Sequence, residues 1–188
     1  RGALMVNYSG HGRIDLLAHE RIFEVHTEVP QLANDHRFSV WMLATCGFSQ
    51  FDDPAQYSGS EYLMNKPDGA AVAVISATRK VYQGENAALN EGMYRRIFLR
   101  DSLGRLLPER PSAALFQYKV ATGDFSANDQ KFGYMGDPTL QMQYPRVFAR
   151  IDSVNGEPVD SVAGSPRISP IAIRSMSHVS VSGTIPGP

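Results

Sequence analysis

Three short apolar runs, separated by longer segments of mixed polarity, constrain the fold of this chain more than any other feature. They span residues 3–6, 38–45 and 70–77. The runs are too short for stable helices, and the third lacks the alternation of a half-exposed strand, so all three have the character of buried strands. Small or polar residues follow each run, namely Gly10-His11-Gly12, Cys46-Gly47 and Thr78-Arg79.

The segments between these runs favour helices. Residues 14–29 suit a loop and a short amphipathic helix, Thr27 and Pro30 predict a helix start, and Ser58 predicts the cap of another short helix. The spacing of apolar residues predicts helices at 85–100 and 112–122, and a short strand follows at 132–135. This order of elements predicts an α/β fold, with a mostly parallel sheet flanked by helices over residues 1–144.

The pattern changes near Tyr144-Pro145. Residues 145–188 have no helical periodicity, and their strands at 147–154 and 178–185 are separated by segments rich in Ser, Gly and Pro. Asn155-Gly156 predicts a hairpin turn. We therefore expect the start of a β-sandwich module in this part of the chain.

Composition and charge argue against nucleic-acid binding, a transmembrane helix and an internal disulfide. The net charge of the 188 residues is −1 and there is no long basic run, so electrostatics give no indication of nucleic-acid binding. No apolar stretch approaches the length of a transmembrane helix. The single cysteine excludes an internal disulfide.

A histidine and that cysteine are the candidate reactive groups. His11 and Cys46 each follow the carboxyl end of a predicted strand, where chemistry collects in open α/β sheets. Taken singly, each is more often structural than catalytic. Together they favour a thiolate nucleophile and an imidazole that protonates a leaving amine. The backbone N–H groups of Gly12 and Cys46 are candidates to hold a developing oxyanion.

Metal and phosphate sites have less support. His11, His19 and His26 do not form a compact ligand set, and one cysteine cannot make a zinc knuckle. Asp52 and Asp53 leave a structural calcium ion open, beside the simpler interpretation as a turn of solvated carboxylates. The glycines around His11 lack the spacing and the lysine of a phosphate loop. We expect no cofactor.

Four motifs follow one another along the chain: residues 7–12 (NYSGHG), 44–53 (ATCGFSQFDD), 69–79 (GAAVAVISATR) and 136–140 (GDPTL). Together they resemble the gingipain family of cysteine peptidases, which belongs to the caspase-like clan. The Cys46 loop with Phe51-Asp52, the end of the third run and the β module most resemble the sortases of type IX secretion (the PorU branch). The resemblance runs from about Gly2 through Tyr144.

The resemblance implies a caspase-like domain followed by an immunoglobulin-like domain. His11 and Cys46 match the catalytic dyad of the family, and Gly12 matches its oxyanion position. The end of the third run would form the wall of the pocket for the residue preceding the scissile bond, through Ser76, Ala77, Thr78 and Arg79. The resemblance also implies two further strand–helix units before residue 1, so that the chain is expected to be the C-terminal part of the catalytic domain.

In the sortase branch, the implied activity is cleavage of a C-terminal sorting domain and transfer of the acyl group to an amine on anionic lipopolysaccharide. The implied partners are protein substrates with that sorting domain and outer-membrane secretion components. The implied location is the cell surface or outer membrane of a Gram-negative bacterium, or the secreted fraction. Two alternatives stay open: a secreted endopeptidase with a preference for basic residues, and a non-catalytic caspase-like scaffold in a secretion complex.

Overall fold

The computed structural model of the chain describes residues 2–100, 106–107, 109–122, 128–144, 150–158 and 178–184. The chain divides into two compact units, of residues 1–99 with 108–142 and of residues 100–107 with 143–188. We describe each unit by itself. A search of the described residues for a helix long and apolar enough to cross a membrane found none.

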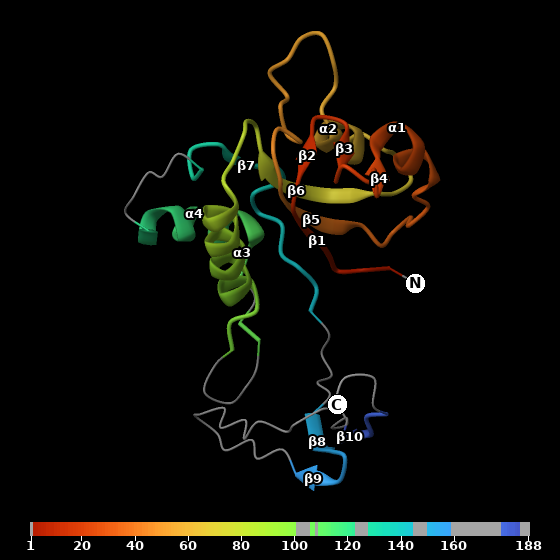
Figure 1. Cartoon of the computed structure of the whole chain (residues 1–188), viewed down its shortest axis with the longest axis vertical. Helices are drawn as coiled ribbons and strands as arrows, with labels where there is room; N and C mark the ends of the chain where they lie inside the picture. The colour runs from red at the N-terminus through yellow and green to blue at the C-terminus, as the bar shows by residue number, and fades with distance from the viewer. Residues whose placement is uncertain are drawn as a thin grey trace. The chain divides into compact units, whose positions relative to one another are not determined.

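A four-stranded sheet forms the centre of the first unit (Figure 1). Its strands lie in the order β1 (Met5–Ser9), β5 (Ser39–Ala44), β6 (Ala71–Ala77) and β7 (Phe132–Gly136). The first three are parallel to one another, and β7 runs antiparallel to β6. Every residue of β5 and all but one of β6 are buried. The predicted mostly parallel sheet is confirmed, and burial on both faces explains its unbroken apolar runs.

Helices cover both faces of this sheet. Figure 1 shows α1 (Val25–Glu28) and α2 (Gly59–Met64) on one side, and α3 (Gln83–Ile97) with α4 (Pro111–Thr122) on the other. Trp41 and Leu43 belong to the core cluster that includes residues of α1 and α2. Because side chains alternate along a strand, Asn7 faces the opposite side, where its amide donates to Asn90 of α3 over 3.1 Å.

Residues 12–31 differ from the prediction. The predicted loop is a small antiparallel sheet of β2 (Gly12–Arg13), β3 (Leu16–Leu17) and β4 (Phe23–Glu24). The predicted short helix is α1, of only four residues, and a 3-10 turn, η1 (Val29–Gln31), follows it. Two-residue strands carry no detectable periodicity in the sequence. Thr27 lies inside α1 and is not its cap, and Pro30 lies within η1.

The segment between β5 and α2 anchors the sheet to its helical cover. The predicted cap of α2 is confirmed, because Ser58 Oγ accepts from the backbone N–H of Glu61 while the Glu61 carboxylate accepts from the backbone N–H of Ser58. Phe48 is fully buried, and its ring lies where a side chain on Gly59 would have to go. Glycine is therefore required at the first position of α2.

The described part of the second unit is a three-stranded antiparallel sheet in the order β10 (Val181–Thr184), β8 (Arg150–Val154), β9 (Glu157–Pro158). Asn155 and Gly156 join β8 to β9 with positive φ angles of 53° and 82°, as the sequence predicts for this hairpin. Residues 145–149, 159–177 and 185–188 lie outside the described residues. The immunoglobulin-like topology stays a prediction.

Candidate active site

The parallel pairing of β1 with β5 brings the histidine and the cysteine to one edge of the sheet. Ser9 lies opposite Ala44 in the strand register, so His11 and Cys46 follow two neighbouring strand ends. His11 is exposed, and Cys46 is a half-buried free thiol. Both line one cavity of about 190 Å³, together with Ser9, Gly10, Val81, Gln83 and Asn86. The pocket therefore brings a thiol and an imidazole to one place.

Backbone groups of Val81 hold the cysteine side chain. The Val81 N–H donates to Cys46 Sγ over 3.5 Å, and the thiol donates to the Val81 carbonyl oxygen over 3.7 Å. Next along the chain, the Gly47 N–H donates to the carbonyl oxygen of Arg79 over 3.1 Å. The loop after β6 therefore fixes both the sulfur and the turn that follows it.

Two buried asparagines hold that loop in turn. Asn128 Oδ1 accepts from the Tyr82 N–H over 3.0 Å, and its amide donates to Asn86 Oδ1 over 3.0 Å. Asn86, in the first turn of α3, donates from its own amide to the carbonyl oxygen of Ala44 over 3.2 Å. Both asparagines are at least nine-tenths buried. The result is a continuous polar connection from the end of β5 to the segment against Cys46.

The histidine is placed by its backbone. Its carbonyl oxygen accepts from the Tyr8 hydroxyl and from the Ala18 N–H, each over 2.7 Å. Burial raises the pKa of the Tyr8 phenol, which stays a neutral donor at physiological pH. The His11 ring centroid lies 5.2 Å from that of His19. His11 is exposed to solvent, so its ring is accessible to a substrate.

Gly12 lies against the end of β5. A Cβ on Gly12 would lie 2.9 Å from the carbonyl oxygen of Leu16 and would collide with the Thr45 hydroxyl oxygen. This contact requires glycine and keeps the backbone of the His11 loop close to that of the cysteine. The N–H groups of Gly12 and Cys46, expected to bind an oxyanion, thus belong to adjoining segments.

A wider cavity of about 570 Å³ adjoins Cys46 on another side. Ten residues line it, namely Gly12, Arg13, Ile14, Cys46, Gly47, Gln50, Gln56, Arg79, Lys80 and Lys131. Arg79, expected in the substrate pocket, is thus in its wall. The three residues before it are placed differently: Ser76 and Ala77 are fully buried, and the Thr78 hydroxyl donates to the carbonyl oxygen of Lys131 over 3.2 Å.

The two carboxylates considered for calcium are engaged by protein groups. Asp52 accepts two hydrogen bonds from the Arg79 guanidinium, over 3.0 and 2.6 Å, and these hold the pKa of its carboxyl below the usual value. Asp53 accepts from the Ala55 N–H and from Gln56 over 3.0 and 2.9 Å. Within the described residues, no group of three His, Cys, Asp or Glu is arranged to hold a metal ion.

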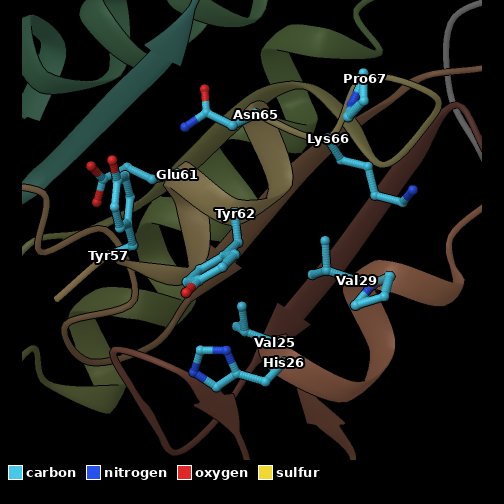
Figure 2. A pocket seen from close by; sticks show the side chains of 10 residues that line it. Val25, His26, Val29, Tyr57, Glu61, Tyr62, Asn65, Lys66 and Pro67 are labelled. Atoms are coloured by element: carbon cyan, nitrogen blue, oxygen red, sulfur yellow. The ribbon is translucent and has the colours of Figure 1, made fainter.

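A third cavity, of about 560 Å³, lies between α1 and α2 and contains none of the expected site residues. Figure 2 shows the rings of His26 and Tyr62 beside each other there, with a centroid separation of 5.0 Å, and Val25 and Val29 nearby. Tyr57, Glu61, Asn65, Lys66, Pro67 and Pro30 complete its lining. Among the described residues that line this cavity, none belongs to a strand of the central sheet and none is a cysteine, serine or threonine.

Sequence reasoning missed the residues that support the cysteine: Val81, Asn86 and Asn128. A signal for one of them is present, because Asn86 falls on the same helical face as the buried Leu89, Met93 and Ile97. A polar residue on an apolar stripe needs a buried partner. Asn128 and Val81 lie in irregular segments, where no periodicity points to them.

The family model described as "Peptidase family C25" matches residues 1–143. The crystal structure of the Arg specific cysteine proteinase gingipain R (RGPB) has a similar fold, with a TM-score of 0.59 and 18% identity over 80% of this chain and 36% of that one.

Two further solved structures share the fold. The complex of Porphyromonas gingivalis RgpB pro- and mature domains matches with a TM-score of 0.59 and 18% identity, covering 80% of this chain and 37% of that one. A structure described as a protease matches at 0.57 and 16%, covering 75% and 36%. The chain thus spans little more than a third of each of these proteins. No curated protein matches the sequence.

Proposed function

This chain belongs to peptidase family C25, and from that premise we propose that it carries the catalytic pair of a cysteine peptidase acting on protein substrates. Cys46 is the nucleophile and His11 the general acid. The observation that carries the proposal is that both line one cavity at the ends of two neighbouring parallel strands. Domain boundaries at 1–144 and 145–188, with an immunoglobulin-like second domain, are part of the proposal.

The proposed reaction proceeds through a thioester. The sulfur of Cys46 attacks the carbonyl carbon of the scissile peptide bond, and the carbon–nitrogen bond breaks as His11 protonates the departing amine. The backbone N–H groups of Gly12 and Cys46 stabilise the negative oxygen of the tetrahedral intermediate. His11 then takes a proton from the incoming water or amine, which attacks the thioester and regenerates the thiol.

The finer proposal is that an amine resolves the thioester, which makes the protein a sortase of the PorU branch. Its support is the resemblance of the motifs at residues 44–53 and 76–79. In this proposal the enzyme removes a C-terminal sorting domain and transfers the acyl group to an amine of anionic lipopolysaccharide. It works with outer-membrane secretion components at the surface of a Gram-negative bacterium.

Replacing the nucleophile tests the peptidase proposal. In the full-length protein, Cys46→Ala should abolish both substrate processing and labelling by a peptide carrying a thiol-reactive group. Lys66→Ala, at the cavity between α1 and α2, is the control and should keep both. Processing that continues in Cys46→Ala would show that another residue performs the chemistry.

A second readout separates transfer from hydrolysis. Mass spectrometry of the product formed with an added amine should show an amide at the new C-terminus if the protein is a sortase. A free carboxylate alone would support the alternative, a secreted endopeptidase. That alternative draws on the similarity in fold to gingipain R, a solved Arg specific proteinase.

A further inference from the structure

The wider cavity beside Cys46 has a wall of one charge sign. Among the described residues, four cationic side chains line it, from Arg13, Arg79, Lys80 and Lys131, and no carboxylate does. Cys46 is among the lining residues, so a group bound there lies beside the residue that attacks the substrate. The charge of this cavity therefore acts on a substrate residue close to the scissile bond.

Two of the four cations are already paired. Arg79 forms a double hydrogen bond with Asp52, and Arg13 Nε lies 2.7 Å from a carboxylate oxygen of Asp15. Each pair is close to neutral as seen from the cavity. The arginines contribute shape and hydrogen-bond donors more than net charge.

The two lysines have no such compensation. Among the described residues, neither Lys80 nor Lys131 forms an ion pair with a carboxylate. Lys131 Nζ donates to the carbonyl oxygen of Lys80 over 2.8 Å and lies 5.3 Å from the centre of the Tyr82 ring. This bond ties the two residues together at the wall and leaves two positive charges without a carboxylate partner.

We infer that this cavity takes an acidic side chain, Asp or Glu, of the substrate residue preceding the scissile bond, with Lys80 and Lys131 as the specificity-determining residues. The inference rests on the proposed function, because it takes Cys46 as the nucleophile. A carboxylate gains charge-assisted hydrogen bonds from the lysines, whereas a cationic side chain meets like charges at short range. The wall is thus opposite in sign to one that would hold an arginine.

Cleavage of a peptide series by the full-length protein tests the inference. In three internal peptides the scissile bond lies far from both ends, and they differ only in having Glu, Gln or Arg before that bond. A fourth peptide has Gln before the bond and ends one residue after it, so that its free C-terminal carboxylate lies close to the bond. We expect kcat/KM for Glu to exceed that for Gln by about tenfold, as one well-placed charge pair provides, with Arg lowest. A fourth peptide cleaved as well as the Glu peptide would overturn the side-chain assignment, and so would equal rates for all three internal peptides.

Charge reversal gives a matched set of variants. Lys80→Glu and Lys131→Glu should each lower kcat/KM for the Glu peptide about tenfold and raise it for the Arg peptide. Arg95→Glu on α3 makes the same change in net charge outside the cavity lining and should leave the ranking unchanged. Lys80 is exposed, so its variant keeps the fold, which a thermal melt checks. An unchanged ranking in both lysine variants would contradict the inference.

A failure of this inference is distinguishable from a failure of the proposed function. A protein whose Cys46 is labelled in a His11-dependent way, but which shows no preference for Glu, is a peptidase with another specificity. A full-length protein that is neither labelled nor active on any peptide overturns the proposed function, and this inference with it.

Discussion

Two cavities of the first unit show that the volume of a cavity does not indicate whether it is a catalytic site. The pocket of His11 and Cys46 has about 190 Å³, whereas the one between α1 and α2 has about 560 Å³. The larger cavity also contains a histidine, His26, with tyrosines and a glutamate around it. Neither its size nor its composition makes it the better candidate for catalysis.

The difference lies in which elements form each wall. Parallel strands end together at one edge of the sheet, and the loops that follow β1 and β5 carry a histidine and a cysteine to the same point. The larger cavity lies between two short helices on one face of the sheet, where side chains meet through packing. A reactive site requires convergence of groups, which strand ends provide and a gap between helices does not.

Removing one histidine from each cavity should give the largest contrast. We expect His11→Ala to lower kcat by 100- to 10,000-fold, the range that a general acid–base group contributes. His26→Ala should leave kcat and KM unchanged, because its ring packs on Tyr62 in the wall of the other cavity. Steady-state kinetics of the full-length variants measure both effects. Equal losses in the two variants would remove the distinction between the cavities.

The sequence predicted one side of this contrast well. Buried parallel strands need unbroken apolar runs, so the runs at 38–45 and 70–77 identified β5 and β6, and Gly47 lies just after the end of β5. The small sheet of β2, β3 and β4 was harder to predict from the sequence, because each of its strands has two residues and forms through pairing with the others. A short strand depends on its partner and leaves no periodic pattern in the sequence.

The support of the site was not predictable to the same depth. Asn128 lies 42 residues from Asn86, and their hydrogen bond exists because the chain between them returns to the sheet. Phe48 lies in the loop after β5, yet it is fully buried and fills the space above Gly59. Such contacts depend on long-range packing, which local sequence does not encode.

One asparagine from each cavity gives the next contrast. Asn86→Ala removes the donor to the Ala44 carbonyl oxygen and one of the two acceptors of the buried Asn128 amide, whose bond to the Tyr82 carbonyl oxygen remains, and it should cost about 1–3 kcal/mol of stability. Because Asn128 also holds Tyr82 beside the cysteine loop, we expect labelling of Cys46 by a small thiol reagent to change about tenfold in rate.

Asn65→Ala is the matched control for that change. Asn65 lines the larger cavity and is exposed, so its loss should stay within about 0.5 kcal/mol and leave labelling unchanged. Chemical denaturation and labelling kinetics give the two readouts. A destabilised Asn86→Ala protein whose Cys46 reacts at the normal rate would reduce Asn86 to a purely structural residue.

The smallest effect concerns the cap of α2, which borders the larger cavity. Ser58→Ala removes the hydroxyl that bonds Glu61 and should cost about 1 kcal/mol, or about 2–4 °C in melting temperature, without any change in kcat. Thr27→Ala is the control, since Thr27 resembles a cap in sequence but lies inside α1, and its melting temperature should stay the same. A loss of catalysis in Ser58→Ala at full stability would show that the two cavities are coupled, for which the hydrogen bond from the Gly59 N–H to the Ile14 carbonyl oxygen offers a route.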